Sequence, residues 1–411
     1  MTALLFRDAR LVDGLSDEPI DGAAVLVVDG RIAEIGSPSL AAPGLADLRV
    51  VDLAGCTLMP GLIDAHVHPT ATEIIEDFQR PMPTTLRALV AKHRLEAMLQ
   101  RGFTTVRDAG GCDVGLRQAT ERGLIDGPRL FVAGKALSQT GGHGDERTVN
   151  DGDPPDGAYP GEFARIADGV EGVRLAARQE LRRGADQIKI CASGGVMSAT
   201  DPVDMTQYSE DEIRAIVEEA ASRRTYVMAH AYGADAIARA VGCGVRSIEH
   251  GNLIDAEAAA AVAARDAFVV PTMVAYEGLD RHGREAGVDA GRLAKNDEVR
   301  QAGLGAFAVL RAAGARVGFG TDLLGVLDEM QPLEFSIRSE VESAADIVRS
   351  ATAVNADLLR RPDLGRIAVG ATADLIVVDG DPLADVSVLA RPTVTLRMVV
   401  IEGHVRMDRL A

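Results

Sequence analysis

Residues 62–68 read LIDAHVH, residues 83–102 read PTTLRALVAKHRLEAMLQRG, and residues 104–110 read TTVRDAG. The first and third segments are apolar runs of strand length, whereas the second repeats its apolar residues every three or four positions. That spacing is typical of a helix that packs one face against a core. A strand, a helix and a second strand in this order predict two parallel strands joined by a right-handed crossover.

The same alternation continues through the middle of the chain. Helical stretches such as EGVRLAARQELRRG and SEDEIRAIVEEAASRR separate the later apolar runs. The eight runs are LIDAHVH, TTVRDAG, RLFVAGK, QIKICAS, YVMAHA, SIEHG, FVVPTM and VGFGTD. Eight strand and helix units close an α/β barrel of the (β/α)8 TIM type, which is the fold we expect. A doubly wound open sheet is the alternative that alternation alone also allows.

Both ends of the chain have a different texture from the middle. They contain short β-branched runs punctuated by Asp-Gly or Glu-Gly, such as AAVLVVDG near the start and ADLIVVDG near the end. Such runs are typical of strands joined by tight turns. We therefore expect residues 1–60 and 365–411 to form one small β-sandwich domain beside a barrel of residues 61–364.

The composition excludes several classes of partner. The chain has 61 acidic and 43 basic residues, and its formal charge of -18 repels nucleic acids and anionic lipid surfaces. No stretch has the length of a membrane span, and the first residues lack a signal peptide's apolar core. The four cysteines lie far apart, without the paired spacing of a disulfide framework or a cysteine zinc site. We expect a cytoplasmic protein that acts on a small molecule.

A pair of histidines ends the first apolar run. In a barrel of this type, functional side chains gather at the C-terminal ends of the strands. His66 and His68 are separated by one residue, so the two-residue period of a strand puts both imidazoles on one face. Two neutral imidazoles at a barrel mouth can bind a metal ion such as zinc. A pair with this spacing can also be incidental.

Other predicted strands end in the same kinds of side chain. His230 ends YVMAH, His250 ends SIEH, and Asp322 ends VGFGTD. Each residue alone is more simply explained as a hydrogen-bonded core residue or a solvated loop residue. Their convergence with His66 and His68 at one predicted rim indicates a metal site.

Lys189 interrupts the apolar fourth run, QIKI. A buried ammonium is costly unless it is paired or neutral. A neutral amine could react with carbon dioxide to give a carbamate, whose oxygens could bridge two metal ions. The alternative is a salt bridge, for instance to Asp108 at the end of TTVRD.

Several segments together resemble the amidohydrolase superfamily, and the resemblance covers almost the entire chain. They are PGLIDAHVH, KICASGGVMS, HAYG, SIEHG, VPTM and FGTD. More narrowly, they resemble its imidazolonepropionase-related branch of metal-dependent dipeptidases, which includes prolidase-like and Xaa-Arg or Xaa-Lys dipeptidases.

The resemblance implies a binuclear centre of two divalent metal ions, with zinc as the default metal. One ion would be bound by His66, His68 and Asp322. The other would be bound by His230 and His250, with carboxylated Lys189 bridging the two. The lysine favours the dipeptidases over imidazolonepropionases, which typically hold one metal without it.

The implied activity is hydrolysis of an amide or peptide bond in dipeptides or N-acyl amino acids, by attack of a metal-bridging hydroxide. Asp322 would take the proton and deliver it to the departing nitrogen. His143 and Tyr232 would contact the substrate and stabilise the tetrahedral intermediate, and packing is the alternative role for Tyr232.

Two other functions remain open from the sequence. One is a cyclic-amide hydrolase or a deaminase of a small heterocycle, as in imidazolonepropionase. The other is a non-enzymatic assembly protein with the amidohydrolase fold. By analogy, we also expect a homo-oligomer.

Two long connections are expected to form the wall of the pocket. The loop 138–161 is rich in Gly, Asp and Pro, and the stretch 276–295 carries several cationic residues. The second stretch could bind a substrate carboxylate through Arg281, His282, Arg284 or Arg292, although a solvated charged helix is the alternative.

Overall fold

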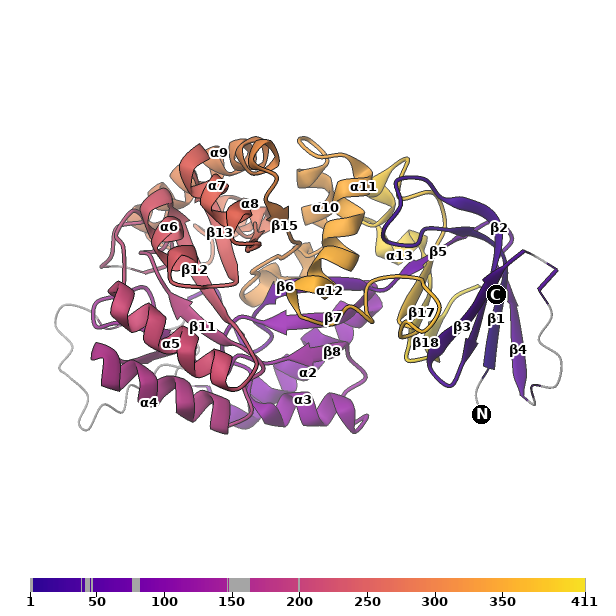
Figure 1. The fold of residues 1–411 in the computed structure, drawn as a ribbon, viewed down its shortest axis with the longest axis horizontal. Helices are drawn as coiled ribbons and strands as arrows, with labels where there is room; N and C mark the ends of the chain where they lie inside the picture. The colour runs from indigo at the N-terminus through magenta and orange to yellow at the C-terminus, as the bar shows by residue number, and fades with distance from the viewer. Residues whose placement is uncertain are drawn as a thin grey trace.

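The computed structural model describes residues 3–37, 39–40, 45, 47–75, 82–145, 147, 163–198 and 200–410. Helices surround a central set of parallel strands, and a separate β-sheet lies at one end of the molecule (Figure 1). No helix among the described residues is both long and apolar enough to cross a membrane.

The eight predicted runs form the strands of the barrel. These are β6 (Leu62–Val67), β7 (Phe103–Asp108), β8 (Arg129–Phe131), β11 (Ile188–Cys191), β12 (Val227–Gly233), β13 (Ser247–Leu253), β14 (Phe268–Val270) and β15 (Arg316–Val317). Neighbouring strands pair in parallel, and the short β9 (Ala136–Ser138) and β10 (Ala164–Ile166) extend the sheet beside β11.

Backbone hydrogen bonds close the ring between the two sheet segments. The amide of Asp186 donates to Val132 O at 2.8 Å, which joins the ends of β8 and β11. On the other side, the amide of Ala65 in β6 donates to Phe319 O at 2.9 Å. The structure therefore confirms the (β/α)8 TIM barrel and excludes the open sheet.

Helices cover the outside of the barrel in the predicted order (Figure 1). They are α2 (Thr84–Gln100), α3 (Val114–Glu121), α4 (Gly169–Arg182), α5 (Glu210–Ser222), α6 (Ala234–Gly242), α7 (Ala256–Ala264), α8 (Met273–His282) and α9 (Ala290–Ala313). Three short helices follow the last strand: α10 (Leu333–Arg338), α11 (Ala344–Arg349) and α12 (Asn355–Leu358). Ser209 and Glu212 form a reciprocal capping box that fixes the start of α5.

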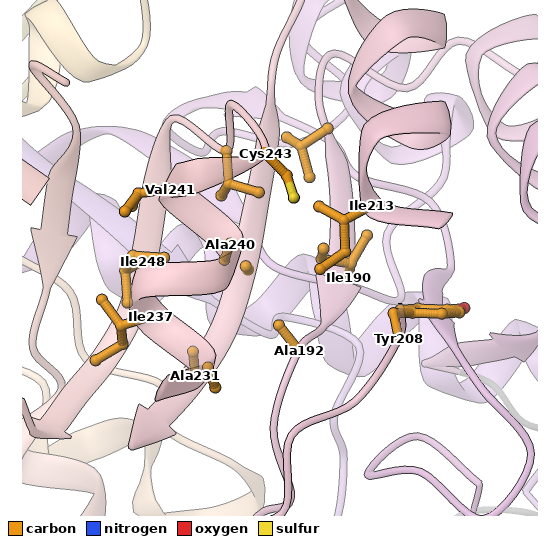
Figure 2. Packing of buried hydrophobic residues seen from close by; sticks show 14 of the residues in the cluster. Ile190, Ala192, Tyr208, Ile213, Ala231, Ile237, Ala240, Val241, Cys243 and Ile248 are labelled. Atoms are coloured by element: carbon orange, nitrogen blue, oxygen red, sulfur yellow. The ribbon is translucent and has the colours of Figure 1, made fainter. Parts of the chain in front are cut away.

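Small apolar side chains fill the space between strands and helices. Figure 2 shows Ile213 of α5 and Ile237, Ala240 and Val241 of α6 in one cluster with Ile248 of β13. All five side chains are buried. Alanines at this interface let the helix backbones approach the strands closely, so the strand ends are held by a tightly packed core.

The two ends of the chain combine in a separate β-sheet (Figure 1). Its N-terminal strands are β1 (Ala3–Leu11), β2 (Ile20–Val28), β3 (Arg31–Gly36), β4 (Leu48–Asp52) and β5 (Thr57–Pro60). Its C-terminal strands are β16 (Leu375–Val378), β17 (Leu396–Ile401) and β18 (His404–Asp408), with α13 (Pro392–Thr395) before β17. Strand β16 pairs with β5, which confirms that strands from both termini form one separate β-sheet. The boundaries at residues 60 and 365 stay predictions.

A buried asparagine reinforces the closure of the barrel. The Nδ2 atom of Asn355 donates to Ile63 O at 2.7 Å and to Phe319 O at 2.8 Å. Its Oδ1 atom accepts from the amide of Phe319 at 3.1 Å. One side chain thus joins the first strand to the segment that follows the last strand.

We predict that Asn355→Ala destabilises the protein by about 2–5 kcal/mol, because it leaves buried backbone groups without partners. The thermal unfolding midpoint would report this as a clear decrease. The exposed Asp297→Ala variant is the control and should unfold close to the wild-type temperature. Equal midpoints for the two variants would contradict this role of Asn355.

Candidate active site

A pocket of about 210 Å³ opens at the C-terminal ends of the barrel strands. The structure brings eight of the sequence-predicted site residues together in its wall. These are His66, His68, His143, Lys189, His230, Tyr232, His250 and Asp322. Catalytic and metal-binding roles require such a convergence of side chains.

His66, His68 and Asp322 form the tightest cluster in the pocket. The Oδ1 atom of Asp322 lies 3.3 Å from His66 Nε2 and 3.1 Å from His68 Nε2. One potential ligand atom from each residue falls within 4.8 Å of the others. Nitrogen and carboxylate oxygen at these separations form a donor set that suits a divalent metal ion.

The other histidines extend this cluster across the pocket. The ring centroids of His66 and His250 are 5.1 Å apart, and those of His250 and His230 are 4.6 Å apart. The ring of His143 stacks on that of His230 with a centroid distance of 4.2 Å. The imidazoles therefore form one continuous group.

Each of the four candidate histidine ligands uses one ring nitrogen to bond to the protein. The pairs are His66 Nδ1 with Glu249 Oε2 (2.8 Å), His68 Nδ1 with Gly110 O (2.8 Å), His230 Nε2 with Gly194 O (3.0 Å), and His250 Nδ1 with Thr272 Oγ1 (2.9 Å). Metal-binding histidines typically have such a partner, which fixes the ring and leaves the second nitrogen for the metal.

Burial keeps two of these rings neutral. Desolvation lowers the pKa of His230 and of His250 well below the usual value for histidine. Asp322, in contrast, is ionised. Burial acts to raise its pKa, but the neighbouring imidazoles of His66 and His68 outweigh burial and hold it well below its usual range. The pocket thus combines nitrogen lone pairs with an ionised carboxylate.

Lys189 lies in β11 with only 4% of its surface exposed. Burial lowers the pKa of its amine. The alternative salt bridge to Asp108 does not form within the described part of the chain, where Asp108 instead accepts from the amides of Cys112 (3.3 Å) and Ala133 (3.1 Å). A buried amine facing the pocket is what carboxylation by carbon dioxide requires.

Two residues of the site have strained backbones. His250 has a φ of 76° and Asp322 has a φ of 52°. Residues other than glycine rarely adopt this left-handed region, and such strain concentrates at functional sites. The strain is consistent with strand ends that turn sharply to point these side chains into the pocket.

A buried ion pair between Arg107 and Glu249, which the sequence analysis did not predict, contacts His66. Arg107 Nη2 donates to both oxygens of Glu249 at 2.9 and 3.0 Å, and both side chains are fully buried. Burial acts to raise the pKa of Glu249, but the guanidinium of Arg107 outweighs it and lowers this pKa to about 2. The sequence signal that could have revealed this pair was a charged residue inside each of two otherwise apolar strands, Arg107 in β7 and Glu249 in β13.

Tyr232 and a second tyrosine share a hydrogen bond at the pocket wall. The hydroxyl of Tyr276 donates to the hydroxyl of Tyr232 at 3.1 Å. Tyr276 belongs to α8, three residues after the VPTM segment, and begins the stretch 276–295 that the sequence predicted to form part of the pocket wall. Because Tyr232 accepts from Tyr276, its own proton is available to donate into the pocket.

The two predicted loops contribute unequally to the pocket. Of residues 138–161, only 138–145 and 147 are described, so the predicted lid lies mostly outside the described residues. Of the four cationic residues proposed in 276–295, Arg292 lines the pocket. Arg281 instead pairs with Glu277 at 2.7 Å and lines, with His282, a separate hollow.

The start of α8 is anchored by a buried carboxyl group. The amide of Val274 donates to Glu334 Oε2 at 2.7 Å. Burial raises the pKa of Glu334 to about 8, so this group retains its proton at neutral pH. The anchor matters for the site because α8 carries Tyr276 into the pocket wall.

Comparisons with known proteins agree with this geometry. A family model described as the amidohydrolase family matches residues 57–406. A solved structure described as a prolidase complexed with N-methylphosphonate-L-proline is 47% identical, with a TM-score of 0.95, and the match covers 98% of this chain and 99% of that one.

Two curated proteins are also similar over most of their length. An ochratoxinase from Aspergillus niger is 32% identical over 398 residues, which cover 91% of this chain and 81% of that protein. An imidazolonepropionase from Salinispora tropica is 28% identical over 424 residues, which cover 94% of this chain and 93% of that protein.

The protonation of Glu334 predicts a specific pH dependence of stability. Its folded pKa of about 8 exceeds the ordinary value of 4.5, so the unfolded chain releases a proton that the folded chain keeps. This term lowers the free energy of unfolding as pH rises from about 4.5 to 8. Glu334→Gln removes this pH dependence. The stability of the variant minus that of the wild type should therefore increase as the pH is raised from 5 to 8.

Thermal unfolding midpoints at both pH values would measure this gain. The exposed Glu340→Gln variant is the control and should show a pH-independent difference from the wild type. A difference between Glu334→Gln and the wild type that stays constant with pH would refute the assignment.

Proposed function

The chain belongs to the amidohydrolase family, and on that premise we propose that it is a binuclear metal-dependent hydrolase that cleaves the amide bond of dipeptides or N-acyl amino acids. The observation that carries this proposal is the gathering of four histidines, Lys189 and Asp322 in one buried pocket. The similarity to a solved prolidase supports the choice of substrate class.

The donor set fits two divalent metal ions. His66, His68 and Asp322 would bind one ion, and His230 and His250 would bind the other, with carboxylated Lys189 between them. The fit rests on the hydrogen-bonded second nitrogen of each imidazole and on the neutral state of His230 and His250. Zinc suits this mixture of nitrogen and oxygen ligands.

Metal ions bound here would supply Lewis acidity, which makes water nucleophilic at neutral pH and polarises the scissile carbonyl. The remaining steps belong to side chains of this chain. The carboxylate of Asp322 would accept the proton of the attacking water and deliver it to the departing amine nitrogen. Its low pKa keeps the carboxylate ionised, which is the state that can accept a proton.

Tyr232 and His143 would bind the substrate around the reacting carbon. The hydroxyl of Tyr232 can donate to the oxygen that becomes negative in the tetrahedral intermediate. His143 faces the same space from its stacked position on His230. Removing a donor of this kind typically costs about 10²–10³-fold in turnover.

The outer wall of the pocket suits a substrate with an apolar portion and a carboxylate. Apolar side chains from loops and helices line it, namely Ile74, Ile75, Val196, Met197, Leu279, Leu324 and Leu327. Arg292 adds a positive charge at the same wall. A dipeptide or an N-acyl amino acid combines these two features.

The retention of every candidate ligand argues against a purely structural role. An assembly protein would have no need to keep six metal-binding side chains oriented toward one buried pocket. Hydrolysis of a cyclic amide remains the competing activity, and the similarity to an imidazolonepropionase is the observation that favours it.

We predict that Lys189→Ala lowers both metal content and turnover. The variant should bind fewer divalent ions per chain than the wild type and lose at least about 10²-fold in kcat, because the bridging ligand is missing. Plasma emission spectrometry and kinetics after metal add-back would measure both effects. Lys92→Ala, which removes a surface ion pair with Glu96, is the control. Full activity of metal-free wild-type protein would refute the binuclear proposal.

A substrate panel would test the proposed substrate class. Dipeptides, N-acyl amino acids, hydantoins and aminated heterocycles would be incubated with chelated protein before and after addition of zinc. We expect metal-dependent release of an amino acid from the linear compounds, with a lower rate for esters of the same compounds that lack a free carboxylate. Hydrolysis of cyclic compounds alone would establish the competing activity instead.

A further inference from the structure

Lys295 of α9 uses its ammonium group in an unusual way. Its Nζ atom donates to three backbone carbonyls, Gly195 O at 2.6 Å, Ser198 O at 2.7 Å and Asp201 O at 3.1 Å. An ammonium group has three donors, so all of them are used. The side chain does not line the pocket and therefore lies behind its wall.

All three carbonyls belong to the loop that follows β11, which we call the β11 loop (residues 193–198 and 200–201). This loop contacts two side chains of the candidate active site. Gly194 O faces His230 Nε2 at 3.0 Å, and Ser198 Oγ faces His143 Nδ1 at 3.1 Å. The position of the β11 loop therefore determines the orientation of both rings.

The contact between the β11 loop and His143 is close. A Cβ atom built at Gly195 would lie 2.1 Å from the ring of His143, so only glycine fits there. A small displacement of the loop would thus move the ring or open a gap beside it.

A second set of hydrogen bonds joins the loop to the backbone of His143. The Oδ2 atom of Asp201 accepts from Gly195 N at 3.1 Å and from Gln207 Nε2 at 3.0 Å. The Oε1 atom of Gln207 in turn accepts from His143 N at 2.9 Å. The ammonium of Lys295 and the carboxylate of Asp201 therefore both hold the β11 loop, and Gln207 links it to the backbone of His143.

The residue type at position 295 is itself informative. Only four of the 43 basic residues are lysines, and two of these four, Lys189 and Lys295, lie at or beside the pocket. A compact ammonium can donate to three carbonyls that converge on one point. The planar guanidinium of arginine presents its donors in a fixed fork and cannot reproduce this arrangement.

We propose that Lys295 is a positioning residue, which holds the β11 loop so that His143 and His230 keep their stacked geometry. This inference rests on the proposed function for its catalytic consequence, because His143 matters only if it contacts substrate. The hydrogen bonds from Lys295 to the β11 loop are present in the protein without substrate. The experiment therefore has one arm with substrate and one without.

The first arm is a double-mutant cycle on kcat/KM. Lys295→Met should lower kcat/KM by about 10- to 100-fold, as expected when a substrate-contacting group is displaced. Lys295→Arg should not restore activity, and Lys92→Met should have wild-type activity. The double variant that carries both Lys295→Met and His143→Ala should lose less kcat/KM than the two single variants predict. Its loss should be at least about 10-fold smaller than the product of the two single losses. Losses that multiply would overturn the positioning role.

The second arm measures amide hydrogen exchange in protein without substrate. Lys295→Met should speed exchange in residues 193–198 and also in residues 138–145, which carry His143, while exchange in α5 stays unchanged. Faster exchange in the β11 loop alone, or no change at all, would overturn the proposal. If the wild type hydrolyses no amide, the proposed function fails. The exchange measurement still decides whether Lys295 positions the segment that carries His143.

Discussion

The buried carboxylate of Glu249 is the constraint on which the candidate site depends. An ionised group at the centre of a barrel is costly unless its charge is compensated, and Arg107 supplies that compensation through two hydrogen bonds. The same carboxylate faces Nδ1 of His66 and therefore favours a proton on that nitrogen. The other ring nitrogen of His66, Nε2, faces Asp322 within the cluster of donor atoms that these two residues form with His68.

The sequence predicted the barrel and the rim residues because the signal for both is local. A polar residue that ends an apolar run is visible at once, and His68, His230 and Asp322 each do so. The structure confirmed the eight strands and the pairing of the two chain ends in one sheet. The open-sheet alternative was wrong because hydrogen bonds join the first strand to the segment after the last.

Features that depend on distant contacts could not be predicted in the same way. Arg107 and Glu249 lie 142 positions apart, and nothing in TTVRD or SIEHG shows that their side chains meet inside the barrel. The cations of residues 276–295 looked equivalent in the sequence, but only their packing distinguishes Arg292 at the pocket from Lys295 behind it. Most of the predicted lid lies outside the described residues.

We propose that this pocket binds two metal ions, and anomalous X-ray scattering would test that proposal most directly. Crystals of protein supplied with zinc and bicarbonate would be measured on both sides of the zinc absorption edge. The account predicts two peaks about 3.5–4 Å apart, one beside His66, His68 and Asp322 and one beside His230 and His250, with Lys189 between them. A single peak, or none, in a correctly folded crystal would contradict it.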